Sequence, residues 1–123
     1  MKLNHLNLIT DNVAALADFF TRFFGFRLDA MRGKDAFAIL TGEDGFSLNL
    51  MKPGKGESTG YPGNFHIGFL VRQPADVDAK HLELGQAGLN VGELQDLTRG
   101  GSEAHIFYCH APGGVLVEVG AYA

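Results

Sequence analysis

The segment NFHIGFLV, residues 64–71, has the composition of a buried β-strand. Its large apolar residues fall at alternate positions and would share one face of the strand: Phe65, Ile67, Phe69 and Val71. The opposite face carries His66 and Gly68, where a core strand would favour a β-branched residue. His66 and Gly68 therefore need an explanation other than packing in the core.

The answer begins with a repeat, because the same order of elements occurs on both sides of a linker at 53–63. Spacing and turn residues predict strand, helix and three strands at 3–9, 13–24, 26–31, 36–40 and 46–51. After the linker they predict the same order at 64–71, 75–87, 89–96, 104–110 and 114–122. We therefore expect one α+β domain, 1–123, made of repeat halves 1–52 and 64–123.

Local signals support both predicted helices. Asn12 is among the candidate N-caps of the first helix, and Gly25 follows its end. Pro74 suits the first turn of the second helix, where its missing N–H is no loss.

Composition excludes several classes of protein. The chain of 123 residues is 46% hydrophobic and 20% charged, as in globular domains, and its net charge is −4. It has neither a basic stripe for nucleic acid nor an apolar run long enough for a membrane. A single cysteine, Cys109, and no room for a signal peptide before the first strand favour the reducing cytoplasm.

Overlaying the two halves aligns four polar positions. His5 falls on His66 in the first strand of each half, and Asn49 falls on Glu118 in the fourth. Two imidazoles and a carboxylate suit a divalent metal and leave coordination positions open for substrate. Each histidine alone is explained as simply by core packing, and Glu118 alone by a solvent-facing position. Together, His5, His66 and Glu118 are the predicted metal ligands.

Other polar residues are candidates for contact with substrate. Tyr108 has a hydroxyl that can donate to a developing oxyanion, although a packed tyrosine with a bonded hydroxyl explains it as well. Arg99 lies in the predicted loop DLTRGGSEA, where it either reaches an anionic substrate or is simply solvated. Cys109 is out of phase with Tyr108 and is interpreted as a core residue.

The segments HLNL, DFFTRFFGF, LNLMKPG, FHIGF and FYCHAPGGVLVEV resemble the vicinal oxygen chelate superfamily over essentially the whole chain. This superfamily includes glyoxalase I, extradiol dioxygenases, fosfomycin-modifying thiol transferases and metal-free bleomycin-binding proteins. The resemblance implies two βαβββ modules in a cupped mixed sheet and a homodimer that shares its sites. It also implies metal binding at His5, His66 and Glu118, with Asn7 and Tyr108 lining the cavity.

The chain also departs from this pattern. Asn49 stands where glyoxalase I has a glutamate that serves as a base, and an amide cannot abstract a proton. The turn APGG, 111–114, replaces the usual DPDG, and the chain ends without the basic segment of the fosfomycin enzymes.

We therefore expect an enzyme that uses Fe, Mn, Zn or Ni to bind a small oxygenated substrate, with Tyr108 as catalytic residue and Asn7, Asn49 and Arg99 as substrate contacts. Lyase, dioxygenase and thiol-transferase chemistry all remain open. The alternatives are a metal-free protein that binds a drug or another small molecule, or a regulatory module.

Overall fold

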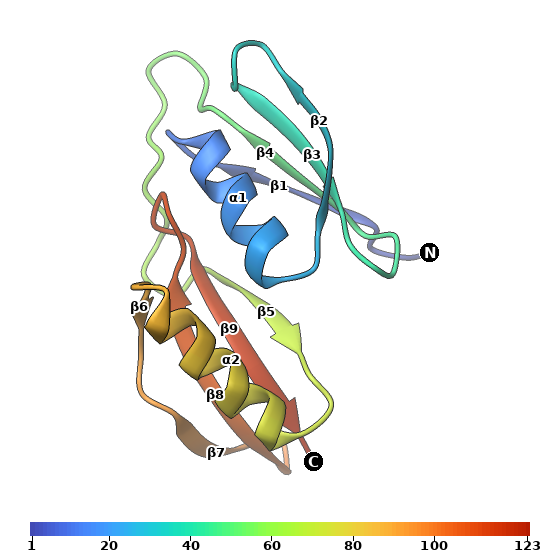
Figure 1. The fold of residues 1–123 in the computed structure, drawn as a ribbon, viewed down its shortest axis with the longest axis vertical. Coiled ribbons are helices and arrows are strands. Elements are labelled where there is room, and N and C mark those ends of the chain that lie inside the picture. Colours follow the sequence, from blue (N-terminus) through green and yellow to red (C-terminus); the bar gives the residue numbers. More distant parts are fainter. The chain divides into compact units, whose positions relative to one another are not determined.

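The computed structural model describes residues 1–123, which divide into two compact units. The first unit comprises Met1–Gly60 and Pro112–Gly114, and the second comprises Tyr61–Ala111 and Val115–Ala123. Each unit contains one mixed β-sheet and one helix (Figure 1). The predicted α+β fold is confirmed. Neither helix has the length and apolar character needed to cross a membrane.

The first unit has four strands and helix α1 (Val13–Phe23). Its sheet has the order β1-β4-β3-β2, formed by β1 (His5–Ile9), β2 (Arg27–Arg32), β3 (Phe37–Thr41) and β4 (Ser47–Met51). Strands β1 and β4 are parallel, and the other pairs are antiparallel. The Asn12 side chain caps α1 by accepting a hydrogen bond from the Ala15 N–H at 3.1 Å. Gly25 follows the helix with φ +71°, which favours glycine.

The core of the first unit lies between α1 and one face of its sheet. The helix and the strands contribute buried apolar side chains at helical and alternating spacing respectively, among them Val13, Leu16, Phe20, Leu8, Leu40, Leu48 and Leu50. The aromatic residues of α1 are therefore largely packing residues, as their spacing predicts.

The second unit has five strands and helix α2 (Pro74–Gln86). Its strands are β5 (His66–Leu70), β6 (Asn90–Val91), β7 (Gln95–Arg99), β8 (Ser102–His110) and β9 (Leu116–Tyr122). The order is β5-β9-β8-β6, and β7 also pairs with β8. Strands β5 and β9 are parallel. Val77 and Leu84 of α2 are fully buried in this unit.

The strand registers agree with the overlay of the two halves. In the first unit Asn7, two residues after His5, pairs with Asn49. In the second unit Gly68, two residues after His66, pairs with Glu118. Parallel pairing of the first and fourth strands thus places the matched positions equivalently within each sheet.

Two predictions about individual strands were wrong. The strand at 64–71 is not fully buried: β5 is an edge strand, and Leu70 is 75% exposed. The predicted strand at 89–96 is divided into β6 and β7, because one extra residue between Val91, which pairs with Cys109, and Gln95, which pairs with Ile106, interrupts the pairing with β8. The prediction that Arg99 lies in a loop was also wrong, because Arg99 is the last residue of β7. Gly100 and Gly101, both with positive φ, form the turn into β8.

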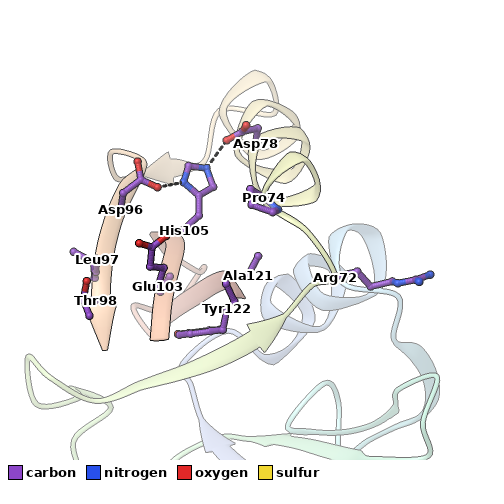
Figure 2. Close-up of a pocket in the computed structure, with 12 residues that line it drawn as sticks. Arg72, Pro74, Asp78, Asp96, Leu97, Thr98, Glu103, His105, Ala121 and Tyr122 are labelled. Carbon is purple, nitrogen blue, oxygen red and sulfur yellow. Dashed lines mark hydrogen bonds and ion pairs between the residues drawn. The ribbon is translucent and has the colours of Figure 1, made fainter. Parts of the chain in front are cut away.

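His105 joins three elements of the second unit on the α2 side of the sheet (Figure 2). Its Nε2 lies 2.7 Å from the Asp78 carboxylate on α2, and its Nδ1 lies 2.7 Å from the Asp96 carboxylate on β7. The hydrogen bonds to Asp78 and Asp96 raise the pKa of His105. His105, Asp78 and Asp96 line a cavity of the second unit. Other ionisable side chains also line this cavity: Arg72, Glu103 and Tyr122. The imidazolium therefore links α2 to the β7–β8 hairpin.

The two leucines of α2 give a matched test of this packing. Leu84 is completely buried, whereas Leu82 is 60% exposed. Leu84→Ala is expected to lower the free energy of unfolding by about 2–5 kcal/mol, because it removes packed methyl groups and leaves a cavity. Leu82→Ala should change it by at most about 0.5 kcal/mol. Urea denaturation of both variants measures this; equal losses would contradict the placement of α2.

The His105 bridge predicts a pH-dependent stability. A raised folded-state pKa means that protonated His105 stabilises the fold fully below its unfolded value, about 6.5. The stabilisation is then lost as pH rises through the folded-state pKa. The free energy of unfolding should therefore fall over that range in the wild type but not in His105→Gln. Urea denaturation at a series of pH values checks this, with His110→Gln as the control that keeps the fall; parallel curves for wild type and His105→Gln would refute it.

Candidate functional site

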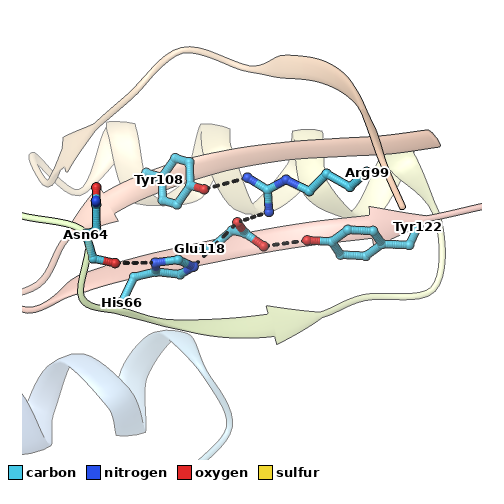
Figure 3. Close-up of polar contacts among 6 residues, drawn as sticks. All are labelled: Asn64, His66, Arg99, Tyr108, Glu118 and Tyr122. Carbon is cyan, nitrogen blue, oxygen red and sulfur yellow. Dashed lines mark hydrogen bonds and ion pairs between the residues drawn. The ribbon is translucent and has the colours of Figure 1, made fainter. Parts of the chain in front are cut away.

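A cluster of polar side chains lies on the face of the second sheet opposite to α2, with Glu118 at its centre (Figure 3). Strand alternation explains which face it occupies. Phe107 contacts His81 of α2, whereas Tyr108, the next residue of β8, pairs in register with Glu118 of β9. Phe107 thus lies on the face that packs against α2, and Tyr108 and Glu118 lie on the opposite face.

Glu118 is a buried carboxylate, 6% exposed, and both of its oxygens have partners. Arg99 donates from Nη1 to Oε1 at 2.9 Å, and the Tyr122 hydroxyl donates to Oε2 at 2.5 Å. Burial raises the pKa of Glu118, but hydrogen bonds from Tyr122, Tyr108 and Arg99 outweigh burial and leave the pKa below its usual value. Glu118 is thus ionised at neutral pH despite its burial.

His66 faces the same carboxylate. Its Nδ1 lies 3.0 Å from the Asn64 carbonyl, and its Nε2 lies 3.9 Å from Glu118 Oε1. The ring also meets the Tyr108 ring edge-on, with centroids 5.5 Å apart. A proton on Nδ1, donated to the carbonyl, would leave the lone pair of Nε2 directed at Glu118. This is the arrangement in which histidine serves as a metal ligand.

Arg99 links the carboxylate to Tyr108. Its Nη2 donates to the Tyr108 hydroxyl at 2.8 Å, while Nη1 holds Glu118. Because the hydroxyl oxygen accepts from Arg99, the hydroxyl proton of Tyr108 is left for a different acceptor, and Glu118 is such an acceptor because its pKa is lowered by a hydrogen bond from Tyr108. The structure therefore brings together four of the residues selected from the sequence: His66, Arg99, Tyr108 and Glu118.

The remaining selected residues, His5, Asn7 and Asn49, belong to the first unit. Asn49 donates from Nδ2 to Asn7 Oδ1 at 2.8 Å across the β1–β4 pair. His5 is exposed, and its Nδ1 lies 2.8 Å from the Asn4 side-chain oxygen. Asn7 and Asn49 thus lie together, as their equivalence to Gly68 and Glu118 requires.

The donor atoms of the second unit can be tested against the size of a metal ion. Nitrogen and oxygen ligands of zinc lie about 2.0–2.2 Å from the ion. Nε2 of His66 and Oε1 of Glu118, 3.9 Å apart, are close enough to contact one ion. No group of three His, Cys, Asp or Glu side chains is arranged to hold a metal. Around Glu118 the second unit therefore offers two donor side chains at a distance that one ion could bridge, His66 and Glu118.

Tyr122 is a member of the cluster that the sequence interpretation missed. Its ring lies back over Gly120 to reach Glu118. A Cβ at Gly120 would come within 2.9 Å of the Ile106 side chain and 3.0 Å of the Tyr122 ring. The sequence could have indicated this contact, because strand alternation in EVGAY places Glu118, Gly120 and Tyr122 on one face.

Gly68 and Cys109 have more limited roles. A Cβ at Gly68 would lie 3.8 Å from Glu118, an ordinary contact, so the position beside Glu118 does not require glycine for space.

Cys109 is 1% exposed, and burial raises the pKa of its thiol to about 11. A protonated, buried thiol is a core residue, as the sequence indicates, and not a nucleophile.

A cavity of about 680 Å³ lies elsewhere in the second unit, around His105 (Figure 2). Its lining includes Asp78, Asp96, Leu97 and Ala121, and it shares only Tyr122 with the cluster around Glu118. Two of its three carboxylate side chains, Asp78 and Asp96, already contact the His105 imidazole. We therefore place the candidate functional site at Glu118.

Comparison with known proteins agrees with this architecture. Residues 2–119 match the family model of the Glyoxalase/Bleomycin resistance protein/Dioxygenase superfamily. A search of curated proteins gives no significant match.

Solved structures give matches over nearly the whole chain. A protein described as a possible glyoxalase from Bacillus cereus is 36% identical, with a TM-score of 0.82 and 97% of each chain covered. Lactoylglutathione lyase from Agrobacterium tumefaciens is 20% identical, with a TM-score of 0.72 and coverage of 98% of this chain and 92% of that one. The fosfomycin resistance protein FosX from Listeria monocytogenes is 17% identical, with a TM-score of 0.74 and coverage of 98% and 93%. The chain belongs to the glyoxalase/bleomycin resistance protein/dioxygenase superfamily.

Proposed function

We propose that this protein is a metal-dependent enzyme that binds a small oxygenated substrate through vicinal oxygens. The observation that supports this most directly is the pairing of His66 with Glu118. One ring nitrogen of His66 contacts a backbone carbonyl, and the other faces a buried, ionised carboxylate at 3.9 Å. A neutral imidazole and a carboxylate presented in this way match the requirements of a divalent metal.

His5 would complete the ligand set, from the same chain or from a second copy in a homodimer. Its Nδ1 contacts Asn4, so Nε2 is the nitrogen left for a metal, as in His66. Two imidazoles and one carboxylate suit iron, manganese, zinc or nickel. When bound, such an ion would supply Lewis-acid polarisation of substrate oxygens or, as iron(II), a position for dioxygen.

The protein side chains would supply the remaining chemistry. Tyr108 would donate its hydroxyl proton to an oxyanion that develops on the substrate, in place of its hydrogen bond to Glu118, and Arg99 would contact an anionic group. Asn7 and Asn49, already joined by a hydrogen bond, would offer amide groups to substrate oxygens. Since Asn49 cannot act as a base, we do not propose the isomerisation that requires a glutamate there; lyase, dioxygenase and thiol transfer remain the candidate reactions.

A second function is favoured by the partners of Glu118. Arg99 and Tyr122 satisfy both carboxylate oxygens without a metal. A protein with this arrangement would bind a small molecule or drug at the same face and perform no chemistry. A net charge of −4 suits a cationic ligand. In either case we propose a homodimer in a reducing compartment, in keeping with the single buried cysteine.

Metal content distinguishes the two functions. Purified wild-type protein is expected to carry a transition metal in a fixed ratio to protein, measured by elemental analysis. His66→Ala and Glu118→Gln should each lower metal affinity by at least about tenfold, since each removes a ligand. His110→Ala is the matched control: it removes a histidine of the same unit that lies outside the cluster, and it should retain the metal.

Failure of the wild type to retain or take up manganese, iron, nickel or zinc would overturn the enzyme proposal. The same protein would then be screened for bound cationic small molecules, as the second function requires.

A further inference from the structure

The position of Arg99 raises a question about how Glu118 can serve a metal. The Arg99 guanidinium and the proposed metal would bind the same oxygen of Glu118, Oε1. Arg99 Nη1 contacts this oxygen at 2.9 Å, and His66 Nε2 faces it at 3.9 Å. A divalent ion bound to Oε1 would lie about 2.1 Å from that oxygen. The two cations would then lie at most about 5 Å apart, so they repel each other within a partly buried site.

Arg99 is the more exposed partner in its ion pair with Glu118. Its side chain is 41% exposed, whereas that of Glu118 is 7% exposed. Arg99 ends β7, and the next two residues, Gly100 and Gly101, are glycines with positive φ. Its long, flexible side chain can therefore reach solvent while the charged head stays hydrated. Glu118, fixed by Tyr122 in the interior of β9, cannot follow it.

We propose that Arg99 is a movable cationic arm: it neutralises Glu118 while no metal is bound, and metal binding transfers its guanidinium to an anionic group of the substrate. This inference rests on the proposed metal site and deepens it by naming the substrate class, an oxygenated acid that bears a carboxylate or phosphonate. Arg99 suits such a group because its planar guanidinium presents paired donors. Metal and anion should consequently strengthen each other's binding.

The first test is the zinc affinity of three proteins, measured by calorimetric titration. Arg99→Gln removes the competing cation, and we expect it to bind zinc more tightly than the wild type by roughly 5- to 150-fold. Arg27→Gln is the matched control, because it removes a cation that pairs with Asp29 in the first unit and makes no contact with Glu118. It should bind zinc as the wild type does.

Each result decides the question. Equal affinity of wild type and Arg99→Gln, weaker binding by Arg99→Gln, or equal tightening in both variants would overturn the competition and leave the metal site standing. If neither wild type nor Arg99→Gln binds zinc, the proposed metal site itself fails, and the arm with it. Zinc binding by Arg99→Gln but not by the wild type would support both the metal site and the competition between Arg99 and the metal.

A second measurement uses the wild-type protein and does not depend on how a variant folds. The Nε–Hε signal of Arg99 should shift during a zinc titration followed by NMR, because its contact with Glu118 is lost. An unchanged signal at saturating zinc would refute the movement. Methylphosphonate, as the anionic probe, should tighten zinc binding in the wild type but not in Arg99→Gln; absence of this coupling in the wild type would refute the transfer to substrate.

Discussion

The structure around the candidate site depends on one constraint: Glu118 is a carboxylate in the interior of a sheet, and its charge must be compensated. Burial alone would drive it to its neutral form, yet hydrogen bonds keep its pKa below the usual value. Tyr122 reaches it over Gly120, Arg99 reaches it from the end of the β7–β8 hairpin, and His66 faces it from β5. Side chains from β5, β7 and β9 therefore converge on the negative charge of Glu118.

This compensation bears on both functions that we propose. With Arg99 in place the carboxylate is satisfied, which is the state that the proposed binding function would use. With a divalent ion on the same oxygen, Arg99 would lose its ion pair with Glu118. Superfamily membership does not choose between these states, because one fold hosts both catalytic and binding proteins. In our proposals the choice depends on whether Arg99 or a metal ion neutralises Glu118.

Sequence patterns predicted the fold well because its elements carry strong local signals. The Asn12 cap, Pro74 at the start of α2 and alternation in β8 and β9 each specify a conformation through nearby residues. Prediction was wrong where the pairing of neighbouring strands decides: β5 lies at the edge of its sheet and is partly exposed, and the strand at 89–96 is divided where an extra residue interrupts its pairing with β8. His105 joins two aspartates contributed by α2 and β7, a contact between segments that are distant in the sequence.

The sequence by itself determined the repeat, the positions of His66, Tyr108 and Glu118 in their strands, and the face on which each side chain lies. These follow from a period of two residues and from equivalent order in the two halves. Only the tertiary structure decided that Arg99 holds Glu118 and Tyr108 together and that Tyr122 completes the cluster. Such contacts depend on strand register and side-chain reach between segments distant in the chain, and no local pattern encodes them.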